Sequence, residues 1–186
     1  MESAGTVGNE EKKTFAGIPA ASFVEDVDAF MKEREGGVES ILAQLDELHG
    51  KYKFMDMNLT ARRKRLKGQI PDIQKSLDMI RVLQAKKAAN EAINTHFLLS
   101  DLLHARAVIE PTERVCLWLG ANVMLEYSLD DAAALLEKNL ETARRNMEQV
   151  QHDVDFLRDQ VTTTEVNMAR LYNWDVKRRQ QAQAAK

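Results

Sequence analysis

The sequence predicts a mainly α-helical protein, in which a long antiparallel two-helix coiled coil carries two β-hairpins between its helices. Apolar residues recur in alternating steps of three and four over two long segments, residues 38–95 and 129–179. Between them, residues 96–128 contain a period of two, which is typical of strands. The composition agrees, because 30% of the 186 residues are charged and only 6% are aromatic. That balance favours long helices over a compact globule.

The central segment, residues 96–128, is expected to form two β-hairpins. Residues 97–103 and 105–109 make the first, and residues 115–127 make the second around the turn-forming Gly120-Ala121-Asn122. Pro111 lies in the link, where it need not donate to a ladder. Large apolar groups occupy both faces, so we expect other chains to complete this sheet. The predicted assembly residues are Phe97, Leu99, Leu103, Val115, Leu117, Trp118, Leu119, Val123, Leu125 and Tyr127.

The N-terminal part is expected to form a disordered tail and then one short helix. Residues 1–16 are small, polar and charged, which predicts disorder. Residues 17–37 form a short amphipathic segment, in which Ser22 and Glu25 have the spacing of a capping box. Its apolar residues at helical spacing are Phe23, Val27, Phe30 and Met31.

The first long helix, residues 38–95, has a coiled-coil seam, which is the row of apolar positions that faces a partner helix. The seam passes through Arg62, and then shifts by one residue beside Gly68 and Pro71. We expect a bend there and not an end, because the pattern resumes beyond it. The seam residues are Val38, Ile41, Leu45, Leu48, Tyr52, Met55, Leu59, Leu66, Ile70, Ile73, Leu77 and Ile80.

The second long helix, residues 129–179, has a more regular seam, with Ser128 or Asp130 as its N-cap. Residues 180–186 are expected to be a frayed tail. The seam positions are Leu129, Ala133, Leu136, Leu140, Ala143, Met147, Val150, Val154, Leu157, Val161, Thr164, Met168 and Leu171.

Charge predicts that the two helices pair with each other. Residues 61–87 contain nine basic and two acidic side chains, whereas residues 128–160 contain eight acidic and four basic ones. An antiparallel pairing aligns these segments, and it also sets Glu39, Asp46 and Glu47 against the basic residues 177–179. We therefore expect a thin rod with the hairpins at one end and both termini at the other.

The sequence contains no pattern of catalytic or ligand-binding residues. The four histidines lack ligand-spaced neighbours, Cys116 has no base nearby in the sequence, and no phosphate-binding loop is present. We expect no cofactor, no membrane span and no signal peptide, and hence a soluble intracellular protein. The basic run RRKRLK, residues 62–67, could bind nucleic acid or act as a nuclear signal. We favour a solvated helix face matched to the acidic second helix.

Six tracts carry a resemblance to a known family. They are GIPAASFVEDVDAFM (17–31), KYKFMDMNL (51–59), RRKRLKGQIPDI (62–73), VCLWLGANVMLEY (115–127), LLEKNL (135–140) and DFLRDQVTTTEVNMARLYNWDVKRR (155–179). VCLWLGANVMLEY and TTTEVNMARLYNWDVKRR are the specific ones. Together these tracts resemble the alpha class of the prefoldin family.

The resemblance implies a heterohexamer with one further alpha-class and four beta-class subunits, in which the hairpins build β-barrels. It implies ATP-independent capture of unfolded actin and tubulin and their delivery to the cytosolic chaperonin, in the cytoplasm and also the nucleus. The von Hippel–Lindau protein is a further implied partner. A structural coiled-coil scaffold that binds folded partners is the alternative.

Capture of clients is expected at the end of the coiled coil that carries the termini. Several seam and flanking residues gather there, and methionine adapts its shape to varied partners. The candidate client-binding residues are Phe30, Met31, Ile41, Leu45, Met168, Leu171, Tyr172 and Trp174.

Overall fold

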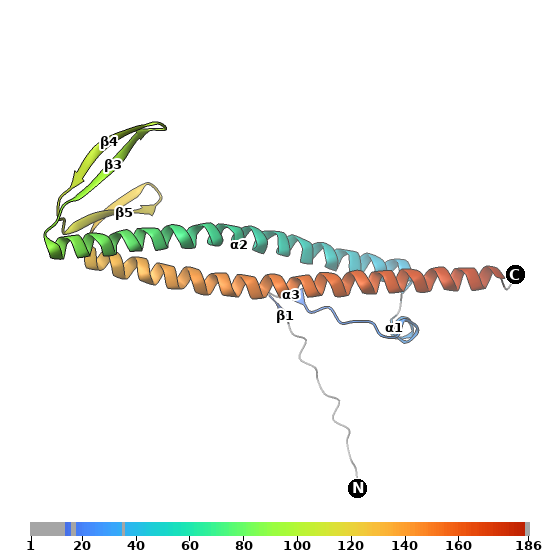
Figure 1. Cartoon of the computed structure of the whole chain (residues 1–186). Helices are drawn as coiled ribbons and strands as arrows, with labels where there is room; N and C mark the ends of the chain where they lie inside the picture. The colour runs from blue at the N-terminus through green and yellow to red at the C-terminus, as the bar shows by residue number, and fades with distance from the viewer. Residues whose placement is uncertain (1–13, 16–17, 35, 185–186) are drawn as a thin grey trace, which may run out of the picture. The chain divides into compact units, whose positions relative to one another are not determined.

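The computed structural model describes residues 14–15, 18–34 and 36–184. These form two compact units, one from the described residues up to Thr60 together with those from His152 onward, and the other from Ala61–Gln151. Helices α2 (Val38–Ala89) and α3 (Leu129–Ala184) each contribute to both units, and they lie side by side within each unit (Figure 1). The two long helices of the predicted coiled coil are therefore present.

The ends of both long helices differ from the prediction. Helix α2 ends at Ala89, not at residue 95, because Asn90 adopts a left-handed backbone with φ of 53°. The N–H groups of Asn90 and Glu91 then donate to the carbonyls of Lys87 and Lys86 over 3.1 and 3.0 Å, which closes the helix in a Schellman motif. Helix α3 continues to Ala184, so residues 180–184 are helical where a frayed tail was expected. Residues 185–186 lie outside the described residues.

The N-terminal segment contains the short helix α1 (Val27–Glu33). Its N-cap is Asp26, whose Oδ1 accepts from the N–H groups of Asp28 and Ala29 over 2.8 and 3.2 Å, so the predicted cap at Ser22 is wrong. Strand β1 (Thr14–Phe15) pairs antiparallel with β2 (Ile18–Pro19), where part of the disordered tail was expected. The rest of that expected tail, residues 1–13 and 16, lies outside the described residues.

The core of the first unit lies between α2 and α3, with α1 packed against it. Val38, Ile41 and Leu171 are buried together, and the partly buried Val27 and Phe30 of α1 pack on them. The paired helices run antiparallel, because Glu39 faces Arg179 at 3.5 Å and His49 contacts Glu165 at 2.8 Å. Further buried seam residues of this unit are Tyr52, Val154, Leu157 and Thr164.

The core of the second unit follows the same seam. Ile80, Leu129 and Ala132 form a buried cluster, and Arg81 of α2 pairs with Glu137 of α3 at 3.0 Å in the predicted antiparallel register. Further buried seam residues of this unit are Leu66, Leu77, Leu140, Ala143 and Val150. Helix α2 continues through Pro71, as predicted.

The predicted seam is wrong at Arg62, and so is part of the expected charge matching. Arg62 is exposed, and the half-buried neighbour is Arg63, whose guanidinium donates to Gln151 Oε1 over 3.1 Å. Within residues 61–151, which the structure describes without a gap, none of the five basic residues of the run forms an ion pair. Apart from the half-buried Arg63, these cations lie on a solvated helix face.

The two predicted hairpins are present as separate two-stranded antiparallel sheets. Strand β3 (Ile93–Ser100) pairs with β4 (Leu103–Ile109), and β5 (Arg114–Gly120) pairs with β6 (Val123–Ser128). The first strand begins at Ile93, three residues before the expected start of this region. Each ladder shifts register once, at Leu99 in the first hairpin and at Leu119 in the second.

Local chemistry fixes both ends of strand β6. The turn before it has positive φ at Gly120, Ala121 and Asn122, with values of 92°, 48° and 61°, as the mirror-image turns of tight hairpins require. At its other end, Ser128 Oγ accepts from the N–H of Asp131 over 3.1 Å and donates to that carboxylate over 2.6 Å. Ser128 is therefore the N-cap of α3, which confirms the first of the two predicted alternatives, Ser128 and Asp130.

Candidate functional site

Many large apolar side chains of the two hairpins are exposed, because no other part of the described chain covers them. Leu102 at the tip of the first hairpin is 95% exposed, and Trp118 on the second is 60% exposed. Each sheet has only two strands, so each strand leaves one edge without a ladder partner in the described chain. The other exposed apolar residues here are Phe97, Leu98, Leu99, Leu103, Val108, Ile109, Leu119, Val123, Met124 and Leu125.

Three of the predicted assembly residues lie elsewhere than expected. Val115, Leu117 and Tyr127 are half-buried and pack on the cluster of Ile80, Leu129 and Ala132, so they anchor the second hairpin to its own helices. The ladder explains this placement, because Val115 lies opposite Tyr127 and so shares one face of the hairpin with it. A direct role of these three residues in assembly stays a prediction, and their half-buried side chains do not add support to it.

The outward face of the second hairpin is different. Trp118 lies opposite Met124 in the ladder, and their side chains are 60% and 55% exposed. Cys116 shares this face and is exposed too. The outward face therefore offers an apolar surface around the Trp118 indole ring, beside Glu126, which lies opposite Cys116. On the inward face, Leu125 and Val123 near the turn are also exposed.

The candidate client-binding residues divide into two groups. Six of them pack into or against the buried cluster of the first unit, where Ile41 is 3% and Leu171 is 1% exposed. Tyr172 is 62% exposed and lines a shallow groove with Met168 and Leu42. The six packed residues are Phe30, Met31, Ile41, Leu45, Leu171 and Trp174. Only Tyr172 and Met168 thus border a groove open to solvent, and client binding at all eight positions stays a prediction.

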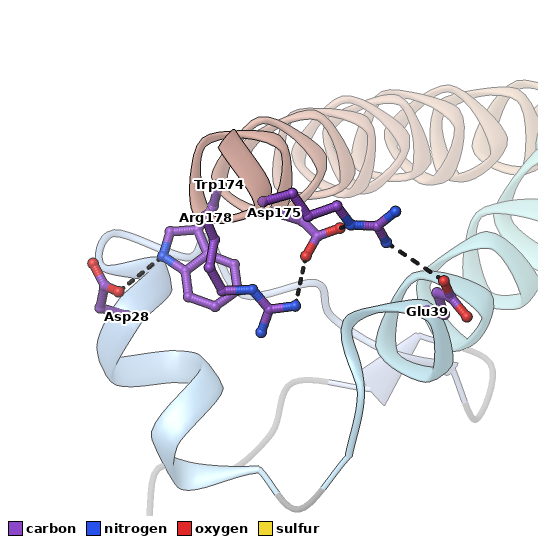
Figure 2. Close-up of polar contacts among 6 residues, drawn as sticks. Asp28, Glu39, Trp174, Asp175 and Arg178 are labelled. Carbon is purple, nitrogen blue, oxygen red and sulfur yellow. Dashed lines mark hydrogen bonds and ion pairs between the residues drawn. The ribbon is translucent and has the colours of Figure 1, made fainter. Parts of the chain in front are cut away.

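Polar contacts hold α1 and the start of α2 to the last turns of α3. Figure 2 shows Trp174 directed at Asp28 of α1, with its indole N–H donating to Oδ1 over 2.8 Å. Asp175 is 6% exposed and accepts from Arg178 over 2.8 Å and from Arg179 over 2.7 Å. Arg178 also lies 5.1 Å from the centre of the Trp174 ring. The buried carboxylate of Asp175 is therefore fully compensated, so it is a structural group.

A row of polar residues on α3 in the first unit was not predicted from the sequence. Gln160 and Asn167 are 8% and 4% exposed, and they hold the extended segment 20–26 against the helix. They stand seven residues apart, with Trp174 a further seven on, so they share one heptad position beside the seam. That spacing was the available signal, because amides repeated beside an apolar seam predict a third chain segment packed there.

Three titrating groups of the first unit have shifted pKa values, and the pKa of Glu47 is lowered first by its hydrogen bond with Lys51. The pKa of Glu165 is lowered, first by its hydrogen bond with His49 and then by the one with Lys53, whose ammonium lies 3.3 Å away. Burial raises the pKa of Tyr52, which is 1% exposed in the seam. Among the described residues no group of three or more His, Cys, Asp or Glu side chains could hold a metal ion. No described helix has a stretch both long enough and apolar enough to span a membrane.

The family model described as "Prefoldin subunit" matches residues 52–174, which is more than half of the chain. The chain belongs to the prefoldin family. It is 53% identical to prefoldin subunit 3 of Mus musculus over 182 residues, which cover 97% of this chain and 93% of that protein. It is also 54% identical to prefoldin subunit 3 of Homo sapiens over 176 residues, covering 94% of this chain and 89% of that protein.

A third relative has a similar identity. Prefoldin subunit 3 of Drosophila melanogaster is 56% identical over 174 residues, covering 93% of this chain and 88% of that protein. Among solved structures, filamentous PFD from Methanocaldococcus jannaschii has 17% identity and a TM-score of 0.48, covering 60% of this chain and 90% of that chain. Family membership rests on the sequence matches. As a prefoldin, the chain is a chaperone subunit and not an enzyme.

Proposed function

We propose that this prefoldin chain is the alpha-class subunit of a hexamer, which captures unfolded actin and tubulin without ATP and delivers them to the cytosolic chaperonin. The hexamer contains one further alpha-class subunit and four beta-class subunits. The observation that carries the proposal is the pair of two-stranded hairpins with exposed apolar side chains on both faces. A hairpin of this kind is marginally stable alone and gains a core when further strands join it.

The energetic argument for assembly comes from the exposed side chains. Moving one large apolar side chain from water into a core gains roughly 1.5–3 kcal/mol. Trp118 and Met124 lie opposite each other, so a sister strand or sheet could cover both at once. The half-buried Val115 and Tyr127 meanwhile keep the hairpin fixed to its helices. Assembly can therefore use a surface that is already oriented.

The argument for capture comes from the exposed groove of the first unit. Tyr172 and Met168 line it with Leu42 and Ala43, so its wall is mostly apolar. Methionine adapts to many partners, and a holdase needs only to bind the unfolded chain to lower its free concentration. No nucleotide cycle is required for that step. We place this activity in the cytoplasm and also in the nucleus, with the von Hippel–Lindau protein as a further partner.

The decisive experiment reconstitutes the chain with its sister subunits. Native mass measurement is expected to show a particle of six chains, and a stable isolated monomer would contradict the proposal. The particle is then mixed with denatured actin diluted from guanidinium, without ATP, and light scattering reports aggregation. Suppressed scattering, followed by transfer of actin to added chaperonin, is the expected result.

A structural scaffold that binds only folded partners is the second candidate. One observation favours it, because six of the eight candidate client-binding residues pack into the unit's own core cluster. A scaffold would leave the scattering of denatured actin unchanged while still forming the six-chain particle. The same measurement therefore separates the two functions.

A further inference from the structure

The segment comprising residues 20–26 is held on α3 by its main chain. The N–H of Ala21 donates to Gln160 Oε1 over 2.7 Å, and the N–H of Val24 donates to Asn167 Oδ1 over 2.9 Å. Asn167 Nδ2 donates in turn to the carbonyl of Ser22 over 2.8 Å. We call Gln160 and Asn167 the amide row; beside it, a guanidinium N–H of Arg170 donates to the carbonyl of Glu25 over 2.6 Å.

None of these four hydrogen bonds involves a side chain of the segment. Every partner atom on residues 20–26 is a backbone N–H or carbonyl, which any residue except proline supplies in full. The segment is extended and forms no helix or strand of its own between residues 20 and 24. Recognition of this kind selects an extended backbone and is indifferent to most of its sequence.

One side chain of the segment is buried. Val24 is 8% exposed, whereas the neighbouring Phe23 is 51% exposed under the guanidinium of Arg170, at 5.1 Å from its ring centre. The site thus combines main-chain hydrogen bonds with the burial of one aliphatic side chain. An unfolded polypeptide presents both features, because its backbone is extended and its aliphatic side chains are exposed.

We propose that the amide row is a binding site for extended, unfolded polypeptide, and that residues 20–26 occupy it as a built-in ligand which clients displace. The inference rests on the proposed function, since it names where and how a client chain is held. Gln160 and Asn167 are almost fully buried under the segment, and within the described chain their amides bond only to its backbone N–H and carbonyl groups or to α3 itself. A client backbone in an extended conformation offers the same N–H and carbonyl groups to a site that the segment has left.

The segment also sets the apparent affinity of the site. A client can bind only those molecules whose own segment has left the site. The apparent Kd for the client is therefore the intrinsic Kd divided by the fraction of such molecules. Weakening the segment without touching the amide row is expected to tighten client binding. Weakening the row itself is expected to abolish it.

The experiment uses the assembled complex and a fluorescent peptide with the sequence of residues 18–28, followed by anisotropy. V24D in the protein removes the buried aliphatic side chain of the segment but leaves the amide row intact, and peptide affinity is expected to rise about tenfold. Adding Q160A and N167A to V24D is expected to lose that gain. N173A, at an exposed α3 position next to Trp174, is the matched control and is expected to bind like the parent.

Folding of the variants is checked by far-UV circular dichroism and native mass, because Val24 precedes all three helices. Hydrogen exchange supplies a second measurement: the amide protons of Ala21 and Val24 are expected to lose protection when denatured actin is bound. Unchanged protection with actin bound, or equal peptide affinity for the parent and V24D, would overturn the inference and leave residues 20–26 as a structural strap.

The failure of this inference differs from the failure of the proposed function. A complex that suppresses actin aggregation while no variant binds the peptide refutes the amide-row site and retains the holdase. A complex that binds the peptide as expected but leaves actin aggregation unchanged supports the site and refutes the holdase.

Discussion

Trp174 near the end of α3 donates its indole N–H to Asp28 of α1 over 2.8 Å, although 146 residues separate the two in the chain. Helix α1 has only seven residues. Helices that short are unstable alone in water, so α1 depends on contacts of this kind for its existence. The hydrogen bond also keeps Phe30 and Met31 against the buried cluster of Val38, Ile41 and Leu171.

Replacing Trp174 by Phe keeps an aromatic ring but removes the donor. We expect the amide protons of α1 to exchange severalfold faster, because a net hydrogen bond of about 1 kcal/mol is lost. D28N is the matched control, since the amide oxygen of Asn can still accept from the indole. Equal exchange in W174F and the parent protein would show that packing alone holds α1.

Replacing Ser128 by Ala removes the N-cap of α3. The unpaired N–H of Asp131 is expected to reduce the free energy of unfolding by about 1 kcal/mol, measured by urea denaturation. Ser76 provides the control, because its hydroxyl only bonds the carbonyl of Asp72 within α2. S76A is expected to change stability by less than about 0.5 kcal/mol, and equal losses in the two variants would contradict the capping role.

Ala121 is a position where the turn chemistry is not optimal. Its φ of 48° lies in the left-handed region, which costs an L-residue with a Cβ roughly 1 kcal/mol. A121G is expected to raise the thermal midpoint of the reconstituted complex, whereas N122G should change it less, because Asn tolerates this conformation. A lower midpoint for A121G would mean that the backbone changes in the assembled protein.

Trp118 and Met124 should decide whether the complex forms. The double variant W118S/M124S removes two exposed apolar side chains from the outward face of the second hairpin, and we expect the six-chain particle to dissociate at micromolar concentration. M57S is the control, because Met57 is equally exposed at 61% but belongs to the first unit, whereas the hairpins belong to the second. Native mass measurement gives the result, and an intact particle for the double variant would exclude this face from assembly.

Tyr52 makes stability depend on pH on the alkaline side. Burial raises its pKa in the folded chain, so the unfolded chain loses the phenol proton first as the pH rises. The contribution is complete below the unfolded pKa of about 10 and is lost above it. Y52F is therefore expected to flatten the fall in the urea midpoint between about pH 9 and 11. Y172F, at a 62% exposed position, should keep the parent slope.

The features that the sequence predicted well are those set by neighbouring residues. The steps of three and four place Val38, Ile41, Leu77 and Leu171 in buried positions, as expected for a seam. The turn at residues 120–122 and the cap at Ser128 also form, because each depends on a few adjacent residues. The first long helix was expected to fade over residues 90–95, and it ends at Ala89, since Asn90 stops it through a backbone conformation that a periodic pattern does not contain.

Periodicity and turn chemistry are local, so two long amphipathic helices and two hairpins could be predicted from neighbouring residues alone. Which apolar side chains enter the chain's own core depends on tertiary packing. The period of two separates Val115 and Tyr127 from Trp118, but it does not say which face of the hairpin packs on the helices and which stays exposed. Tertiary packing alone also placed residues 20–26 against Gln160 and Asn167, since a contact between distant segments depends on how the whole unit folds.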